Sequence, residues 1–244
     1  MPTMNLANCR EWYECAEPNA TDDFVGSHAG LTLTQFNSPY VTTIGTLAAR
    51  GFDRPSARYG ERADHAALSF GAGKSFTFAM RLRFRNSDAG AAANHGIAEK
   101  SDGGTSEYQI FCAASAGLTL ATFYFSVSGV GFVSVPDTDF FFDTDYTEIC
   151  EFDQPNGIVR ITQNDNQGSP YETTGLSGSC TDGTGAFRLG HLDDSLTEKF
   201  NGKIAAFAIF EGLMSSADKT TFHNGGAGVS YAEVAARRFF LARF

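Results

Sequence analysis

The sequence predicts an all-β protein, an antiparallel two-sheet sandwich in jelly-roll order with short helices near the C-terminus. Charged residues make up only 19% of the 244 and hydrophobic ones 42%, with 23 Phe, 8 Tyr and 26 Gly. Aromatic side chains pack well on a pleated sheet, and glycine supplies the positive φ of tight turns. Short alternating segments separated by turn residues recur along the chain, which is typical of sandwiches.

The clearest strand is predicted over 76–84, where every even position is apolar and arginine occupies two odd ones. Only a period of two places all five large side chains on one face, so this strand is half-buried. The apolar parity changes near Ala121 and Thr122, which indicates a bulge or a strand break. Weaker patterns predict further strands at 108–112, 118–120, 123–127, 131–135, 146–152, 157–163 and 186–190.

The segment 204–210 has no polar face, so we expect a strand that is covered on both sides. Glu211–Gly212 ends this strand. Ser215 or Ser216 can then cap a short helix, and Gly225–Gly226 supplies the left-handed residues that end it.

The tail, residues 229–244, predicts a second helix, because Ser230 and Glu233 have the spacing of a capping box. The tail ends in large apolar side chains that are costly to expose, so we expect them to dock on the body or on a neighbouring subunit. These partner-docking residues are Phe239, Phe240, Leu241 and Phe244. Neither a repeat nor a linker interrupts the chain, so we expect one domain over 1–244.

Composition and charge also exclude some classes of protein. The net charge of −10 disfavours nucleic acid, which needs clustered basic residues. No run reaches the roughly 18 apolar residues of a membrane helix, and no basic head precedes an apolar stretch, so we expect synthesis in the cytoplasm without a Sec-type signal. We expect the five cysteines to be reduced, buried thiols. They are Cys9, Cys15, Cys112, Cys150 and Cys180.

Short segments between about residues 12 and 233 occur in an order that is similar to that of one family. They are Trp12 with Thr21–Asp23 and Leu31–Leu33, Ala57–Tyr59 with Leu68–Phe70, Lys74–Met80, Ile97–Lys100 with Tyr108–Ile110, Phe187–Gly190, Phe200–Ile204 and Asn224–Gly228. They resemble the laminin-G-like, concanavalin A-type jelly-roll domains of bacterial and phage proteins, with Met80 in place of the family's usual Trp. The resemblance implies the fold first, because this fold hosts lectins, hydrolases, adhesion modules and virion parts.

The resemblance also suggests calcium, which such domains often hold by loop carboxylates. Asp22 and Asp23 lie at the matching turn and are the candidate metal ligands. The family's calcium-binding members often carry an acidic residue where this chain has Ala205, which favours a plain turn whose Asp side chains cap backbone amides. Asp193 and Asp194 form a second candidate ligand-binding turn.

Another acidic cluster, at 137–145, surrounds the run Phe140–Phe142. The cluster has no glycine where an EF-hand loop turns, so we interpret it as a charged loop around a buried aromatic wedge.

The sequence does not supply the catalytic motif of laminarinase-type relatives, which place three carboxylates at alternate positions of one strand. In the nearest segment, 148–153, only Glu151 and Asp153 share a face, and Glu148 lies on the other. We therefore expect no catalysis.

We expect an interaction module, most plausibly a structural or decoration component of a larger assembly such as a phage virion, with protein partners or self-assembly. An extracellular assembly is the other location that we expect. The alternative is a calcium-dependent, carbohydrate-binding lectin-like module, and a virion protein that adheres to glycans would combine both. A laminarinase-type glycoside hydrolase is the remote alternative.

Overall fold

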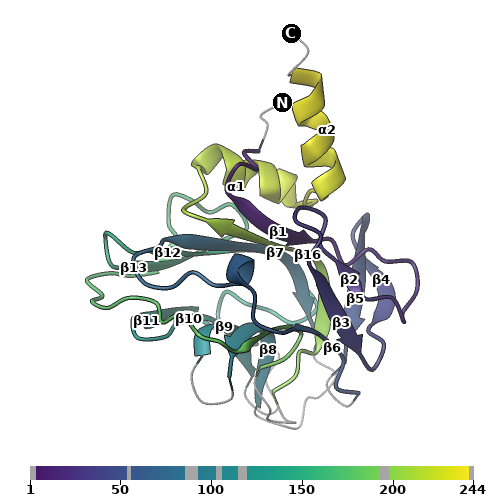
Figure 1. Ribbon diagram of the computed structural model, residues 1–244, viewed down its shortest axis with the longest axis horizontal. Coiled ribbons are helices and arrows are strands. Elements are labelled where there is room, and N and C mark those ends of the chain that lie inside the picture. The colour runs from purple at the N-terminus through teal and green to yellow at the C-terminus, as the bar shows by residue number, and fades with distance from the viewer. Residues whose placement is uncertain are drawn as a thin grey trace.

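The computed structural model describes residues 4–53, 56–85, 93–102, 106–114, 120–192 and 198–241, with only the backbone of 93 and 237–241. Two antiparallel sheets face each other, as the sequence predicts (Figure 1). We call the first the covered sheet. Its strand order is β14 (Tyr171–Thr173), β13 (Ile158–Gln163), β12 (Asp145–Asp153), β7 (Phe76–Phe84), β16 (Gly202–Glu211), β5 (Leu47–Phe52) and β4 (Tyr40–Ile44), and β1 (Cys9–Tyr13) also pairs with β16.

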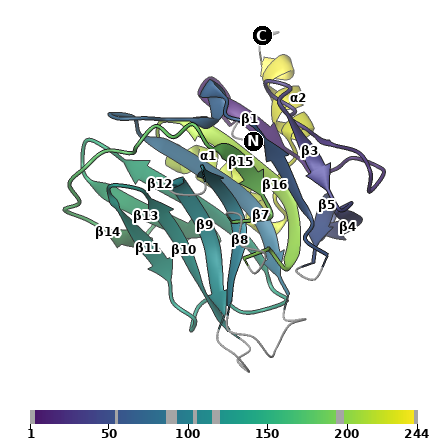
Figure 2. The same cartoon turned by 60° about the horizontal axis from the view of Figure 1, so that its bottom comes forward.

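We call the second the open sheet. Its order is β11 (Gly131–Val135), β10 (Ala121–Val127), β9 (Ser106–Ala114), β8 (Ala93–Ser101), β15 (Ala186–Leu189), β6 (Tyr59–Arg62), β3 (Thr32–Phe36) and β2 (Phe24–Val25). The helices α1 (Ser216–His223) and α2 (Tyr231–Leu241) lie on the far side of the covered sheet, away from the open sheet (Figures 1 and 2). Two short 3₁₀ turns, Ala66–Leu68 and Asn224–Gly226, complete the elements.

The main core lies between the sheets, and the alternation of β7 correctly predicts the face that it turns to this core. Its even residues, from Phe76 to Phe84, are buried there. The strand is not half-buried as expected, because its odd residues Thr77, Ala79 and Arg81 are also buried, on the outer face of the covered sheet. Phe78 lies 6.0 Å from Phe125 of the open sheet and 5.8 Å from Phe207 of β16, measured between ring centroids. Aromatic contacts therefore join the two layers.

Strand β16 is covered on both faces, which confirms the prediction. Ile204 and Phe207 pack in the main core, whereas Ala208 and Phe210 belong to a second cluster outside the covered sheet. The register shifts between Ile204 and Ala206, so the strand changes the face it presents at this bulge. Trp12, Met214, Phe222 and Val234 are also members of the second cluster.

Both predicted helix caps are present. The Ser215 hydroxyl accepts from the Asp218 amide at 3.1 Å, and Ser230 and Glu233 form the reciprocal capping box. The glycine pair after α1 takes positive φ as predicted, 62° at Gly225 and 90° at Gly226, but the left-handed turn begins one residue earlier, at Asn224 with φ 48°. Asparagine tolerates this conformation better than most residues.

The predicted aromatic wedge is wrong at one position. Phe140 is fully buried, but 46% of Phe141 is exposed. Phe141 forms an isolated bridge with Leu120, and neighbouring residues of an extended segment point to opposite sides. The strand expected at 118–120 lies partly outside the described residues, and β10 begins at Ala121. None of the described helices is long and apolar enough to span a membrane.

Candidate functional site on the open sheet

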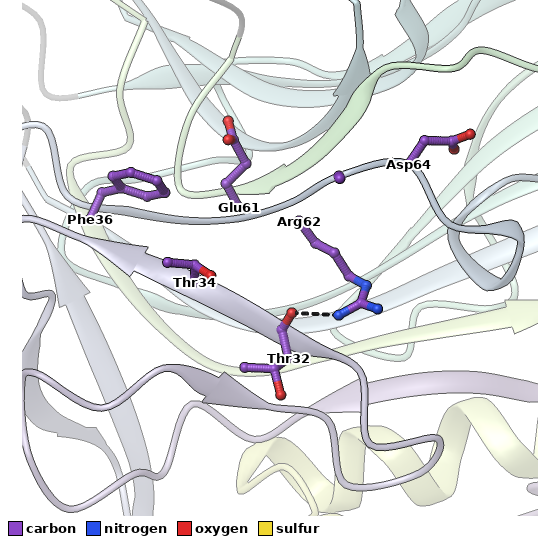
Figure 3. Close-up of a pocket in the computed structure, with 7 residues that line it drawn as sticks. Thr32, Thr34, Phe36, Glu61, Arg62 and Asp64 are labelled. Carbon is purple, nitrogen blue, oxygen red and sulfur yellow. Dashed lines mark hydrogen bonds between the residues drawn. The ribbon is translucent and has the colours of Figure 1, made fainter.

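A pocket of about 420 Å³ lies at the outer side of the open sheet, between β3 and β6 (Figure 3). Its lining combines two threonines, one aromatic ring and three charged side chains. The lining residues are Thr32, Thr34, Phe36, Glu61, Arg62, Ala63 and Asp64.

The pocket forms where two paired strands separate. The β3–β6 ladder runs from Phe36–Tyr59 to Thr34–Glu61 and stops there. Beyond this point the Arg62 guanidinium bridges the gap, donating to the carbonyl oxygen of Thr32 at 3.0 Å (Figure 3). Leu33 faces the main core, so the alternation of β3 turns Thr32 and Thr34 outward.

Phe36 forms one end of the pocket, and Asp64 lies at the other (Figure 3). The Phe36 ring is 37% exposed and stacks on Tyr59 with centroids 4.6 Å apart. Tyr59 in turn stacks on His191 at 4.9 Å. These two contacts hold the exposed ring in a fixed orientation, which suits it to receive the apolar face of a ligand.

The carboxylates of the pocket are neutralised by cations. Arg188 Nε lies 2.7 Å from Glu61 Oε2, and Lys100 Nζ lies 3.0 Å from Asp64 Oδ1. The hydrogen bond from Lys100 is the largest cause of the lowered pKa of Asp64. The pocket therefore offers hydrogen-bonding groups with little net charge, and its chemistry suits an uncharged ligand with many hydroxyl groups.

The predicted metal ligands cap local backbone and side-chain groups. Asp22 Oδ2 accepts hydrogen bonds from the backbone and side-chain nitrogens of Asn19, at 3.1 and 3.2 Å. Asp23 Oδ1 accepts a hydrogen bond from the backbone N–H of Gln35 at 2.9 Å. Among the described residues, no group of three or more His, Cys, Asp or Glu side chains could hold a metal ion. A calcium ion at Asp22 and Asp23 stays a prediction.

Other predicted residues fall outside what the structure describes. Asp193 and Asp194 lie in a gap between two described ranges, and Phe244 lies after the last described range. Phe239, Phe240 and Leu241 belong to α2 by their backbone, but their side chains are not described.

The carboxylates of segment 148–153, the one nearest to the catalytic motif, do not all lie on one face, as the sequence predicts. Glu148 is buried between the sheets, whereas Glu151 lies on the outer face of the covered sheet with 1% of its side chain exposed. Lys219 Nζ lies 2.6 Å from Glu151 Oε2, and Arg160 Nη1 lies 3.6 Å from the same oxygen. Because Glu148 and Glu151 face opposite sides of β12, they cannot act on one substrate.

Sequence reasoning missed the pocket, although one local signal was present. Thr32, Leu33 and Thr34 alternate hydroxyl and apolar side chains, as a strand with one solvent-exposed face does, although Gln35 and Phe36 break this alternation. Glu61 and Arg62 gave no such signal. Their role depends on partners that are distant in sequence, since Arg188 is 127 positions from Glu61.

No protein-family profile matches the sequence, and no curated protein matches it. Solved structures do. The binding domain of Paraclostridial Mosquitocidal Protein 1 aligns with a TM-score of 0.64 and 8% identity, over 87% of this chain and 51% of that one. The receptor binding domain of botulinum neurotoxin mosaic serotype C/D aligns with a TM-score of 0.62 and 10% identity, over 89% and 51%.

A third similar structure is domain 4 of AbnA, a GH43 extracellular arabinanase from Geobacillus stearothermophilus, in complex with arabinotriose. It has a TM-score of 0.59 and 11% identity, over 87% of this chain and 97% of that one. The chain thus spans about half the length of the two toxin binding domains and nearly all of the arabinanase domain. At these identities the likeness concerns the fold alone, which is a concanavalin A-like jelly-roll sandwich.

Proposed function

We propose that the chain is a non-catalytic carbohydrate-binding module that holds a neutral glycan in the pocket between β3 and β6. The pocket's composition carries this proposal. A sugar ring has an apolar C–H face and an edge of hydroxyl groups, and the pocket pairs the fixed, exposed Phe36 ring with Thr34, Glu61 and Arg62. A few polar groups beside an apolar wall are the usual features of a small-ligand site.

Electrostatics favour a neutral glycan over an acidic one. The chain carries a net charge of −10, so its field opposes the approach of sialylated or sulfated glycans. Arg188 and Lys100 already bind the carboxylates of the pocket. Arg62 also lines the pocket, but its guanidinium donates to the Thr32 carbonyl oxygen, and Lys100 also pairs with Glu107, so the group has no net positive charge to attract an anionic sugar.

The structural likeness supports the proposal by analogy. One similar domain was solved in complex with arabinotriose, and two others are described as binding domains. We infer a module of the laminin-G-like kind, in which function resides in a site on the sandwich.

Isothermal titration with arabinotriose and a panel of other neutral trisaccharides tests the proposal, with Phe36→Ala as the variant. We expect Phe36→Ala to weaken binding about tenfold, because truncating an aromatic anchor commonly costs more than 1 kcal/mol. Phe141→Ala is the matched control, since Phe141 is also an exposed phenylalanine but lies outside the pocket. Equal binding by wild type and Phe36→Ala, or no binding to any trisaccharide, rejects the pocket.

The same titration in EDTA distinguishes glycan binding in the pocket from calcium-dependent binding by a lectin-like site. Binding through the pocket should survive the chelator. Binding that EDTA abolishes, and that Asp22→Asn or Asp23→Asn also abolishes, would favour a calcium site at that turn instead.

A second candidate role is assembly through the C-terminal helix. The first turns of α2 are anchored, because Tyr231 packs on Trp12 with centroids 5.8 Å apart and Val234 is fully buried. The helix then projects away from the sandwich (Figures 1 and 2). We propose that Phe239, Phe240, Leu241 and Phe244 dock on another protein chain, in an extracellular assembly or a virion.

Removing residues 239–244 tests this second role, with light scattering as the readout. We expect the truncated chain to lose an oligomeric state that the full chain has. An identical mass for both chains speaks against self-association through this helix.

A further inference from the structure

One row of paired residues crosses the open sheet from the pocket to the opposite edge. Each member is the Cα partner of the next, from Thr34 on β3 to Phe132 on β11. In order, the row is Thr34, Glu61, Arg188, Glu99, Gln109, Ser126 and Phe132. Six strand spacings separate its ends, which is roughly 29 Å.

The row faces outward and is accessible on almost every strand. Its neighbours in sequence point inward, among them Leu33, Phe187 and Phe125 in the main core. Only Glu99 is buried, and its Oε1 accepts from Gln109 Nε2 at 2.7 Å and from Ser106 Oγ at 2.6 Å. The other members are exposed or partly exposed.

The row carries one guanidinium, that of Arg188, and two carboxylates, those of Glu61 and Glu99. Glu61 pairs with Arg188 within the row itself. The row therefore offers hydroxyl, amide and ion-paired groups, and these suit the hydroxyls of an uncharged chain. Because the row starts at Thr34 and Glu61, it is continuous with the pocket.

An aromatic cluster lies at the far end of the row, formed by Phe111, Tyr124 and Phe132. Phe111 and Tyr124 stack with centroids 4.9 Å apart, and the Phe132 ring lies 6.1 Å from Tyr124. Phe132 is 58% exposed. The core of β10 is already filled by Phe123 and Phe125, so these outward rings are not needed for packing. Adjacent exposed aromatic rings on a monomer mark a contact surface.

We infer that this aromatic cluster is a second sugar-contacting subsite, and that the open sheet binds a linear neutral polysaccharide along the row. The inference rests on the proposed function, because it places one end of the polysaccharide in the β3–β6 pocket. Phe36 and Phe132 stack on sugar rings near the two ends, and the polar row contacts the hydroxyls between them. A trisaccharide is too short to reach both aromatic ends, whereas an octasaccharide reaches both.

Chain length and two substitutions together test the inference. The probes are trisaccharides and octasaccharides of the linear arabino-, laminari- and cello- series, titrated against wild type, Phe36→Ala and Phe132→Ala. Phe141→Ala again serves as the matched control for an exposed phenylalanine off the row. Thermal unfolding verifies that each variant is folded.

We expect wild type to bind the octasaccharide at least about tenfold more tightly than the trisaccharide, because the second contact is intramolecular. Phe132→Ala should reduce the octasaccharide affinity to the trisaccharide level and leave trisaccharide binding unchanged. Phe36→Ala should weaken both. An octasaccharide affinity that Phe132→Ala does not change overturns the second subsite alone. Failure of wild type to bind any probe, or binding that is insensitive to Phe36→Ala, overturns the proposed pocket.

Discussion

Glu148 gives the fold a pH dependence that a single substitution should remove. The side chain is fully buried between the sheets, where Gln163 Nε2 donates to Oε1 at 3.0 Å and Oε2 has no hydrogen-bond partner. Desolvation by burial raises the pKa of Glu148 well above its usual range. The unfolded chain has an ordinary glutamate pKa of about 4.3.

The sign follows from proton binding. Between the unfolded and the raised folded pKa, the folded protein holds one more proton at Glu148 than the unfolded chain. The contribution of Glu148 to stability is therefore fully present below about pH 4.3 and is lost as pH rises towards the folded pKa, at about 1.36 kcal/mol per pH unit.

Glu148→Gln should abolish this loss, because the amide keeps the acceptor for Gln163 and does not titrate. Urea unfolding at pH 4, 5, 6 and 7 measures this effect, as the difference in unfolding free energy between the variant and wild type at each pH. Between pH 4.3 and the raised folded pKa, the difference should change in favour of the variant by about 1.36 kcal/mol per pH unit. Glu172→Gln, at an exposed position of β14, is the control for the substitution itself. A difference for Glu148→Gln that stays constant from pH 4 to 7 would refute the reasoning.

Two further predictions concern buried groups. The Glu11 carboxylate accepts hydrogen bonds from four backbone N–H groups, those of residues 12, 28, 29 and 31. Glu11→Ala should therefore lower the unfolding free energy, measured by urea unfolding, by about 3 to 5 kcal/mol. A loss below about 1 kcal/mol would contradict this role. Glu11→Gln, which keeps one oxygen acceptor, should cost less. Burial raises the pKa of all five thiols, and that of Cys9 rises to about 12. The native protein should therefore not react with a thiol reagent at pH 7, whereas protein unfolded in guanidinium should react at every cysteine. Rapid labelling of the native chain would show that at least one thiol is accessible.

The sequence predicted those parts of the fold that depend on local patterns. The alternation over 76–84 identifies β7 and the face it turns to the main core, and the unbroken apolar run at 204–210 identifies a strand covered on both sides. The spacing of Ser230 and Glu233 identifies the start of α2. Each pattern lies within one element, so neighbouring residues suffice to interpret it.

The remaining elements depend on pairings between distant segments. The edge strand β4 and its neighbour β5 were not predicted, because glycine and arginine interrupt the alternation of 40–52. Arg50 is nevertheless fully buried. Its guanidinium donates to the carbonyl oxygens of Pro39 and Asn19, which only the folded chain brings near. The pocket and the row depend in the same way on six strand registers, and none of them is encoded in a local motif.

The two terminal segments lie on one side of the molecule. Met4 and Leu6 at the beginning, and Val234 of α2 near the end, all pack in the cluster outside the covered sheet. The row from Thr34 to Phe132 lies on the opposite surface. A tether at either terminus, such as a biotin tag on a sensor chip, would therefore present the open sheet to the solution, and surface-immobilised protein should bind soluble polysaccharide as well as free protein does.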